Sequence, residues 1–341
     1  MRNLSNTGVK FERIGDTSRR AQIVGYHGKP APVDRSKAEQ IDVNGLKPVD
    51  RQNVKIDGNE IESKFKIGME FEKTRFNRGA VQEYPLLCGF ETDSSCGVEA
   101  VTHILPLVAP SMWRTKVFNM FHEAKRIIDD VYSPSNSRCG GHITLSVDGM
   151  DGAELMARVR KFAPIVLAVF RKRLVNNYCS GNPQMLPMGE GVMSSGSSKY
   201  VVCKDTGFGI EFRLPSRFTS VKQTIRRYEL MYHLLDFAVN KQDATMQKFY
   251  NTVKPILVSM YEGNEDKAKA VIGLARHFAK FMQSGKVCKH VAPWLEGWWS
   301  RERRSIGRYS RHYKRGLRVD VQSVNEWLQA RAEAPQNTVH L

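Results

Sequence analysis

The sequence lacks the features that would tie a protein to the cell exterior or to a membrane. Its six cysteines are irregularly spaced and none form a CxxC pair, and a chain of 341 residues has no need of a disulfide framework. Cys139 and His142 have the spacing of half a zinc site, but no second half follows, so we do not expect zinc. The longest apolar run, Ala163 to Phe170, is too short to cross a bilayer, and no apolar stretch follows Met1 as a signal peptide would require. These absences favour a cytoplasmic protein with reduced thiols and no membrane contact.

Acidic residues are also scarce relative to basic ones. Asp and Glu total 35 against 52 Lys and Arg, which gives a formal net charge of +17. A surplus of this size commonly accompanies a polyanionic partner or substrate, although the same charge can serve solubility alone. Apolar residues make up 41% of the chain, which is enough for a sizeable core and excludes wholesale disorder.

Regular apolar patterns are nearly missing before residue 63 and are frequent after it. Residues 1–62 are polar with scattered Pro and Gly, so we expect an irregular N-terminal extension there. Residues 63–240 carry strand and helix periodicities and are predicted to form the catalytic domain. Residues 241–341 are predicted to be a basic helical region, in which an aromatic stretch, Trp294–Trp299, precedes the Arg301–Arg318 cluster.

Periodicity predicts the elements of these two regions. Strands are expected where apolar and polar residues alternate or β-formers cluster, at 65–72, 97–102, 141–147 and 210–214. Helices are expected at 111–132, 151–176, 220–239, 243–261, 264–283 and 324–334. Clean alternation is typical of a sheet with one polar face. We therefore predict an α+β fold, with helices on one face of the sheet and a polar site on the other.

Chemically active side chains gather on the predicted polar face. They are five carboxylates, one imidazole and one guanidinium: Glu70, Glu72, Asp93, Glu99, Glu211, His142 and Arg213. Residues two apart on a strand point the same way, and carboxylates this close repel each other unless cations bridge them. Hard oxygen ligands suit Mg²⁺ or Mn²⁺, which would bridge the phosphates of ATP. A single Glu-x-Glu is more often a solvated strand face, but the joint occurrence favours a metal and nucleotide site.

Five ordered blocks carry a more specific signal. They are Gly68–Glu72, Asp93–Glu99, Cys139–Ile143, Lys199–Tyr200 and Ile210–Arg213. Together they resemble the amidoligase family of the carboxylate–amine ligase superfamily, to which glutamine synthetase belongs, over about half the chain. The resemblance implies a glutamine-synthetase-like antiparallel sheet and an ATP-dependent ligase that forms an acyl phosphate. It departs from the family at Gly140 and Gly141, where many relatives carry a larger residue, and at Asp93, where glutamine synthetase has Glu.

The resemblance also implies a role for each residue. The metal ligands would be Glu70, Glu72, Glu99, His142 and Glu211, with His142 nearest the γ-phosphate of the nucleotide. Arg213 and Lys199 would bind phosphate and act in catalysis, with Arg171 and Arg173 as alternatives to Lys199. Asp93 would act between the metals and the amine substrate. The expected substrates are a carboxylate and an amine, with peptides and proteins among the candidates.

A second hypothesis keeps this fold without its chemistry. In it, the chain is a basic nucleic-acid-binding or scaffold protein that carries an inactive ligase-like fold. Aromatic residues interleaved with Arg in the tail would stack on bases and neutralise phosphates, although Trp294–Trp299 could equally be ordinary helix packing. Under both hypotheses the Arg301–Arg318 cluster is the expected polyanion contact.

Overall fold

The structure is a computed structural model, and it describes about two thirds of the chain. The described residues are 63–82, 84–93, 95–176, 178–179, 181, 183–185 and 200–295, with three two-residue strands before them. The strands are β1 (Ile23–Val24), β2 (Lys55–Ile56), β3 (Asn59–Glu60), β4 (Phe65–Lys73), β5 (Leu87–Asp93), β6 (Gly97–Thr102), β7 (Leu105–Pro106), β8 (Ile143–Val147), β9 (Cys203–Asp205) and β10 (Ile210–Phe212).

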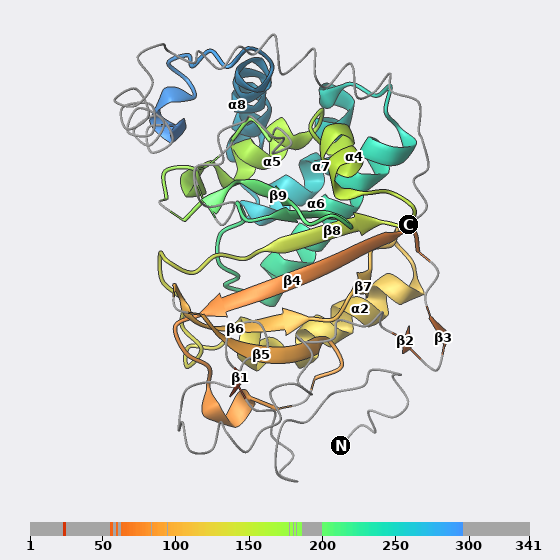
Figure 1. Ribbon diagram of the computed structural model, residues 1–341, viewed down its shortest axis with the longest axis vertical. Coiled ribbons are helices and arrows are strands. Elements are labelled where there is room, and N and C mark those ends of the chain that lie inside the picture. The colour runs from red at the N-terminus through yellow and green to blue at the C-terminus, as the bar shows by residue number, and fades with distance from the viewer. Residues whose placement is uncertain are drawn as a thin grey trace, which may run out of the picture.

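Eight of these strands form one sheet, in the order β1-β5-β6-β4-β8-β10-β9, with β7 paired to β4 (Figure 1). The pair β1–β5 is parallel, and the other described pairs of this sheet are antiparallel. The predicted α+β class with an antiparallel sheet is therefore confirmed. Consecutive strands β5 and β6 form a hairpin, whereas β4 lies between β6 and β8 and joins the two halves of the sheet.

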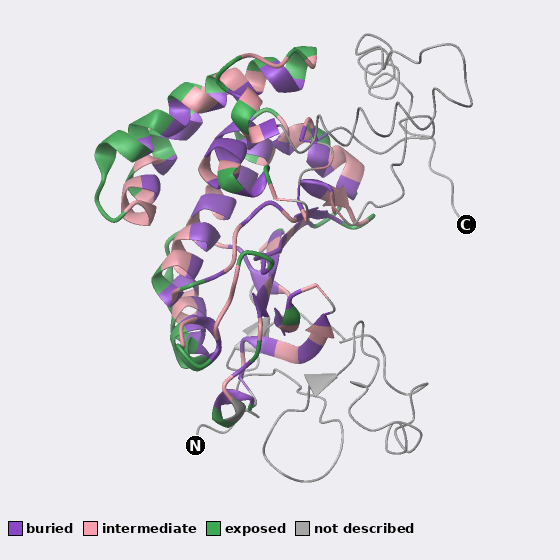
Figure 2. Ribbon diagram, turned by 90° about the vertical axis from the view of Figure 1, so that its left-hand side faces the viewer, coloured by how far each residue is buried: buried purple, intermediate pink, exposed green. Residues whose placement is uncertain are grey.

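The helices stand on one side of the sheet and above its β9 edge (Figures 1 and 2). They are α2 (Met112–Glu123), α3 (Lys125–Ile128), α4 (Gly152–Val159), α5 (Ala163–Phe170), α6 (Val221–Asn240), α7 (Met246–Met260) and α8 (Glu265–Ser284), with short 3-10 turns η3 (Arg78–Ala80) and η4 (Arg171–Arg173). Among the described helices, none combines the length and apolar character needed to cross a membrane.

Alternation along β4 explains how the sheet acquires two different faces. Phe65, Ile67, Met69 and Phe71 are at most 4% exposed and lie in the core. The Phe71 ring packs against Phe218, with ring centroids 4.7 Å apart. Because successive side chains point to opposite faces, the even-numbered residues of β4 face away from this core.

Two predicted helices are shorter than their apolar patterns indicated. The helix expected to reach Tyr132 breaks at Ala124 and ends with α3 at Ile128. Asp130 then accepts a hydrogen bond from the backbone N–H of Tyr132 at 2.7 Å, which forms a turn. Val131 and Tyr132 are 83% and 65% exposed, so the predicted extension of this helix to residue 132 was wrong.

The helix expected over 151–176 is divided into α4, α5 and η4. Pro164 stands in the first turn of α5, where proline is tolerated because its missing N–H is not needed. A proline there cannot continue the helix before it, which gives the physical reason for the break. The helix expected over 220–239 is confirmed as α6, with the Ser220 side chain accepting from the backbone N–H of Gln223.

The two helices after residue 240 pack into the same core as the sheet. Phe249 of α7 lies 5.3 Å from Phe162 and 5.2 Å from Phe237, measured between ring centroids. The helices expected at 243–261 and 264–283 correspond to α7 and α8. The division of the chain at residues 62 and 240 stays a prediction, and the helix expected over 324–334 and the Arg301–Arg318 cluster lie outside the described residues.

Candidate active site

Three carboxylates stand in a row across three neighbouring strands. Glu91 of β5 pairs with Glu99 of β6, and Glu99 pairs with Glu72 of β4. Residues directly opposite each other in antiparallel strands share a face of the sheet, with Cβ atoms about 5 Å apart. None of the three is more than 6% exposed. A buried row of like charges requires either protonation or neighbouring cations.

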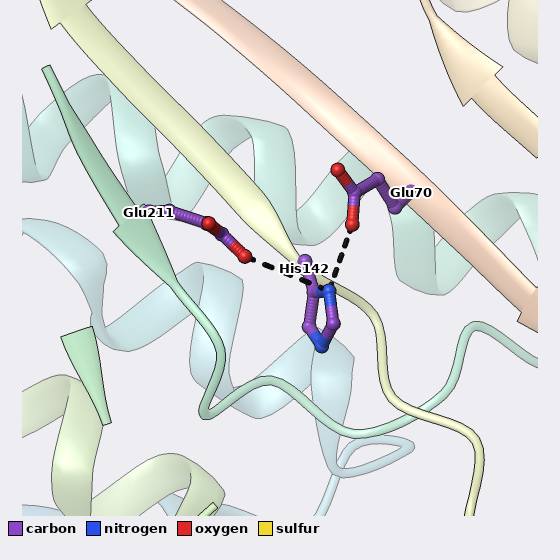
Figure 3. A group of neighbouring side chains, drawn as sticks. All are labelled: Glu70, His142 and Glu211. Atoms are coloured by element: carbon purple, nitrogen blue, oxygen red, sulfur yellow. Dashed lines mark hydrogen bonds and ion pairs between the residues drawn. The ribbon is translucent and has the colours of Figure 1, made fainter. Parts of the chain in front are cut away.

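A second group gathers beside this row, around His142 (Figure 3). The His142 Nδ1 lies 2.8 Å from Glu70 Oε2 and 3.7 Å from Glu211 Oε1. Each of these three residues offers one potential metal-ligand atom, and these atoms all lie within 4.8 Å of one another. Glu70 comes from β4, His142 from the residue before β8, and Glu211 from β10, so the order of these three strands brings the group together.

Glu72 connects the row to the His142 group. Its Oε1 lies 3.0 Å from His142 Nε2, and its Oε2 accepts a hydrogen bond of 2.5 Å from the backbone N–H of Gly140. Burial alone would lower the pKa of His142, but the charges of Glu72 and Glu70 outweigh burial and the opposing charge of Arg213, so this pKa is raised. The neighbouring carboxylates therefore favour the protonated imidazole, which would balance part of their charge.

The pKa of Glu99 reflects the excess of negative charge in this cluster. Burial is the largest cause of a pKa well above the ordinary value for this carboxyl, and the charges of Glu70 and Glu91 come next. Glu72 and Asp93 raise it further. The carboxyl group of Glu99 is therefore held toward its neutral form by the surrounding negative charge. A bound cation would reverse that preference.

Arg213 supplies a cation at the edge of the group. It follows β10 one residue beyond the pair Phe212–Ile143, which places it level with His142. Its Nη1 donates to Glu211 Oε1, while its Nε is buried and has no hydrogen-bond partner among the described residues. This N–H is therefore a buried donor that the described residues leave unsatisfied. Burial would lower the pKa of Arg213, but the charge of Glu211, followed by those of two further glutamates, raises it.

The two glycines before His142 lie in close contact with the group. A Cβ atom at Gly140 would be 3.0 Å from Arg173 Nη2 and 3.2 Å from His142 Nε2. A Cβ at Gly141 would be 2.5 Å from the carbonyl oxygen of Ser216 and 2.7 Å from the Phe218 ring. These contacts leave no room for a Cβ at Gly141 and little room at Gly140.

Basic residues predicted between the His142 and Glu211 motifs have different surroundings. Arg173 is 7% exposed, and its Nη1 donates to the carbonyls of Ser137 and Cys139, both at 3.2 Å, so it contacts the loop that precedes His142. Arg171 instead stacks over the Trp294 ring at 5.4 Å. Lys199, the first choice from the sequence, lies outside the described residues.

Asp93 lies at the end of β5, in the turn that leads to β6. Its Oδ1 accepts hydrogen bonds from the backbone N–H of Ser95 at 2.5 Å and of Cys96 at 3.3 Å, and from the Ser95 hydroxyl. These bonds stabilise the turn, which continues into Gly97 at φ +122°. A role in catalysis for Asp93 stays a prediction.

Sequence reasoning missed Glu91 because it did not recognise β5 as a strand. The signal was available, since Glu91 and Asp93 are two apart, as Glu70 and Glu72 are. It also missed Lys204 of β9, which pairs with Glu211 and so projects from the same face of the sheet.

Comparison with known proteins adds no family to this geometry. No protein-family model matches the chain, and no curated protein matches it. The resemblance to amidoligases is therefore a prediction carried by the strand motifs themselves.

Proposed function

We propose that this chain is an ATP-dependent carboxylate–amine ligase with a glutamine-synthetase-like sheet. The observation that carries the proposal is the convergence of Glu70, His142 and Glu211, from three different strands, onto one small volume. The buried row of Glu91, Glu99 and Glu72 beside it enlarges the negative site. Such an arrangement is costly for a protein that has no cation to place there.

The donor set fits Mg²⁺ or Mn²⁺. Carboxylate oxygens dominate it, with one imidazole, and hard divalent cations prefer oxygen ligands. The residues that would hold the ions are Glu70, Glu72, Glu99, His142 and Glu211, and we add Glu91 because it pairs with Glu99. When bound, the ions would supply charge neutralisation for the carboxylates and for the phosphate oxygens of ATP.

Residues of the chain itself would orient the reactants. Arg213 keeps Nη1 on Glu211 and leaves its Nε edge for phosphate oxygens, where a planar fork can donate two parallel hydrogen bonds. The Gly140 N–H holds one oxygen of Glu72, and His142 holds the other, so this carboxylate is oriented from both sides. A carboxylate substrate would receive the phosphoryl group, and an amine would then displace phosphate to form the amide.

Thermal unfolding with and without Mg²⁺-ATP tests the binding part of the proposal. A ligand at about 100 times its Kd adds about 2.7 kcal/mol to the free energy of unfolding. We expect this stabilisation in the native chain and its loss in Glu70→Gln and Glu211→Gln. The matched control is Glu154→Gln on α4, because the partly exposed Glu154–Arg158 ion pair lies within a single helix. Full stabilisation of both site variants would contradict the metal assignment.

Turnover tests the reaction itself. ADP and phosphate release should depend on the presence of both a carboxylate and an amine, surveyed as a panel of pairs. Binding of Mg²⁺-ATP that the two site variants abolish, with no turnover for any pair, would favour the alternative of an inactive ligase-like fold. Salt-dependent affinity for nucleic acid would then be the measurement that supports a binding protein.

A further inference from the structure

A thiol and two imidazoles lie together at the end of α8, in elements that the candidate active site does not use. The Sγ of Cys288 lies 3.7 Å from Nδ1 of His277, within hydrogen-bond range for sulfur. The rings of His277 and His290 are stacked, with centroids 4.0 Å apart and planes inclined by 18°. His277 belongs to α8, whereas Cys288 and His290 belong to the segment that follows it. A thiol, an imidazole within hydrogen-bond range of it and a second imidazole stacked on the first therefore adjoin each other.

The other five cysteines have different surroundings. Four of them, Cys96, Cys139, Cys179 and Cys203, are at most 3% exposed. Burial raises the pKa of Cys96, Cys139 and Cys203, which keeps their thiols protonated. Cys88 is half-buried, as Cys288 is, but its Sγ donates to the carbonyl oxygens of Val101 and Thr102, both at 3.4 Å. A carbonyl oxygen orients a thiol but cannot remove its proton, whereas an imidazole can.

The sequence around Cys288 is basic. From Lys267 to Leu295 the sequence contains no Asp or Glu, and Lys280, Lys286 and Lys289 are exposed. Reactive cysteines characteristically lie in partly exposed, electropositive surroundings of this kind. Burial, followed by the charges of His290 and Lys280, lowers the pKa of His277, which favours the neutral ring. When the ring proton is on Nε2, the Nδ1 lone pair faces the thiol.

We propose that Cys288 is a nucleophilic thiol activated by His277, and that it is the site where peroxides and other soft electrophiles modify this chain. Nδ1 of His277 takes the thiol proton, and the sulfur attacks one oxygen of a peroxide. The S–O bond forms as the O–O bond breaks, so sulfur loses two electrons and the peroxide gains them. The departing oxygen takes the proton from His277, which leaves a sulfenic acid and an alcohol or water.

Alkylation by iodoacetamide tests the proposal without any assumption about the ligase reaction. The intact chain is treated under native conditions, and the modification rate of each cysteine is followed by peptide mass spectrometry. Cys288 should react at least about tenfold faster than Cys88. This ratio is set below the roughly 10²- to 10⁴-fold acceleration that a positioned base supplies in enzymes. Treatment with hydrogen peroxide, trapped by a sulfenic-acid reagent, should label the same residue first.

Substitution of the base gives the sharper test. His277→Gln should slow alkylation of Cys288 to about the rate of Cys88, while His122→Gln on the exposed face of α2 should change nothing. The four buried cysteines report whether a variant remains folded, because unfolding would expose all of them to the reagent. If His277→Gln unfolds, two other measurements still test the proposal. One is the alkylation rate of Cys288 in His277→Asn, and the other is the ratio of the Cys288 and Cys88 rates in the native chain. Equal rates for these two cysteines in the native chain, or a folded His277 variant with an unchanged Cys288 rate, would overturn the proposal.

Discussion

The two faces of β4 accommodate charge in opposite ways. On the core face, Lys73 is 2% exposed, and its Nζ donates to the carbonyls of Ile128 at 2.7 Å and Phe218 at 3.1 Å. On the other face, Glu70 and Glu72 lie among further carboxylates from neighbouring strands. An isolated buried charge can be satisfied by backbone dipoles, whereas a group of like charges cannot satisfy itself. Backbone acceptors therefore suffice for the single charge of Lys73, whereas the crowded carboxylates on the other face are the reason why we propose a cation-binding site there.

The largest effect is expected where the two faces meet, at Gly141. Its added Cβ would collide with the Ser216 carbonyl and with the Phe218 ring, which packs on the core face of β4. Gly141→Ala should lower the free energy of unfolding by about 3 kcal/mol, the upper range for overpacking. Urea denaturation measures this. Gly273→Ala is the control, because nothing lies within 4 Å of a Cβ there and alanine favours a helix. An unchanged midpoint for Gly141→Ala would show that the loop shifts freely.

The next effect belongs to the site face alone. Arg213→Lys keeps the charge near Glu211 but removes the two-donor fork. Given the proposed ligase reaction, single-turnover formation of ADP should slow about 10²-fold, equivalent to about 2.7 kcal/mol, with nucleotide affinity largely kept. If Arg213 is only a structural partner of Glu211, the variant will instead melt earlier and retain its chemistry. Melting temperature and turnover rate, measured on the same preparation, distinguish the two.

On the core face, Lys73 should make the stability of the chain depend on pH. Burial is the main cause that lowers the pKa of Lys73 to about 8 from 10.5. Between those values the unfolded chain binds more protons than the folded one, so stability rises with pH. Relative to Lys73→Met, the native chain should gain about 2 kcal/mol from pH 7.5 to 9.5. Urea unfolding at both pH values measures the difference. If the free energy of unfolding changes equally with pH in the two proteins, the Lys73 ammonium is hydrated and its pKa is not lowered.

The smallest effect is expected at Glu99, and its sign is opposite to that of most core substitutions. Burial, followed by the charges of neighbouring carboxylates, holds the pKa of Glu99 well above its ordinary value, so its contribution to stability falls as pH rises above that ordinary value. In a metal chelator, Glu99→Gln should therefore stabilise the chain by about 1 kcal/mol at pH 7 and by less at pH 5. The same variant should lose stabilisation by Mg²⁺-ATP. Destabilisation in chelator would mean that the negative cluster is already balanced within the protein.

Local pattern was enough to predict several elements and the shared faces within them. The alternation in β4 and the helix expected over 220–239 are both confirmed, because a strand period of two and a helical period of 3.6 can be recognised from neighbouring residues alone. For the same reason, Glu70 and Glu72 could be placed on one face, as could Glu211 and Arg213. The helix ends at Ile128 and before Pro164 were missed. The apolar spacing continued past both points, so the prediction followed it through a turn in one case and a proline in the other.

Strand order and register were decided only by the tertiary structure. The row Glu91–Glu99–Glu72 depends on which strands pair and in what register, and a shift of one residue would move each side chain to the other face. The requirement for glycine at Gly141 likewise comes from Ser216 and Phe218, far along the chain. By itself, the sequence determined which residue types were available on each strand. Their assembly into one site depended on contacts between distant segments, which a periodicity of two or 3.6 residues does not encode.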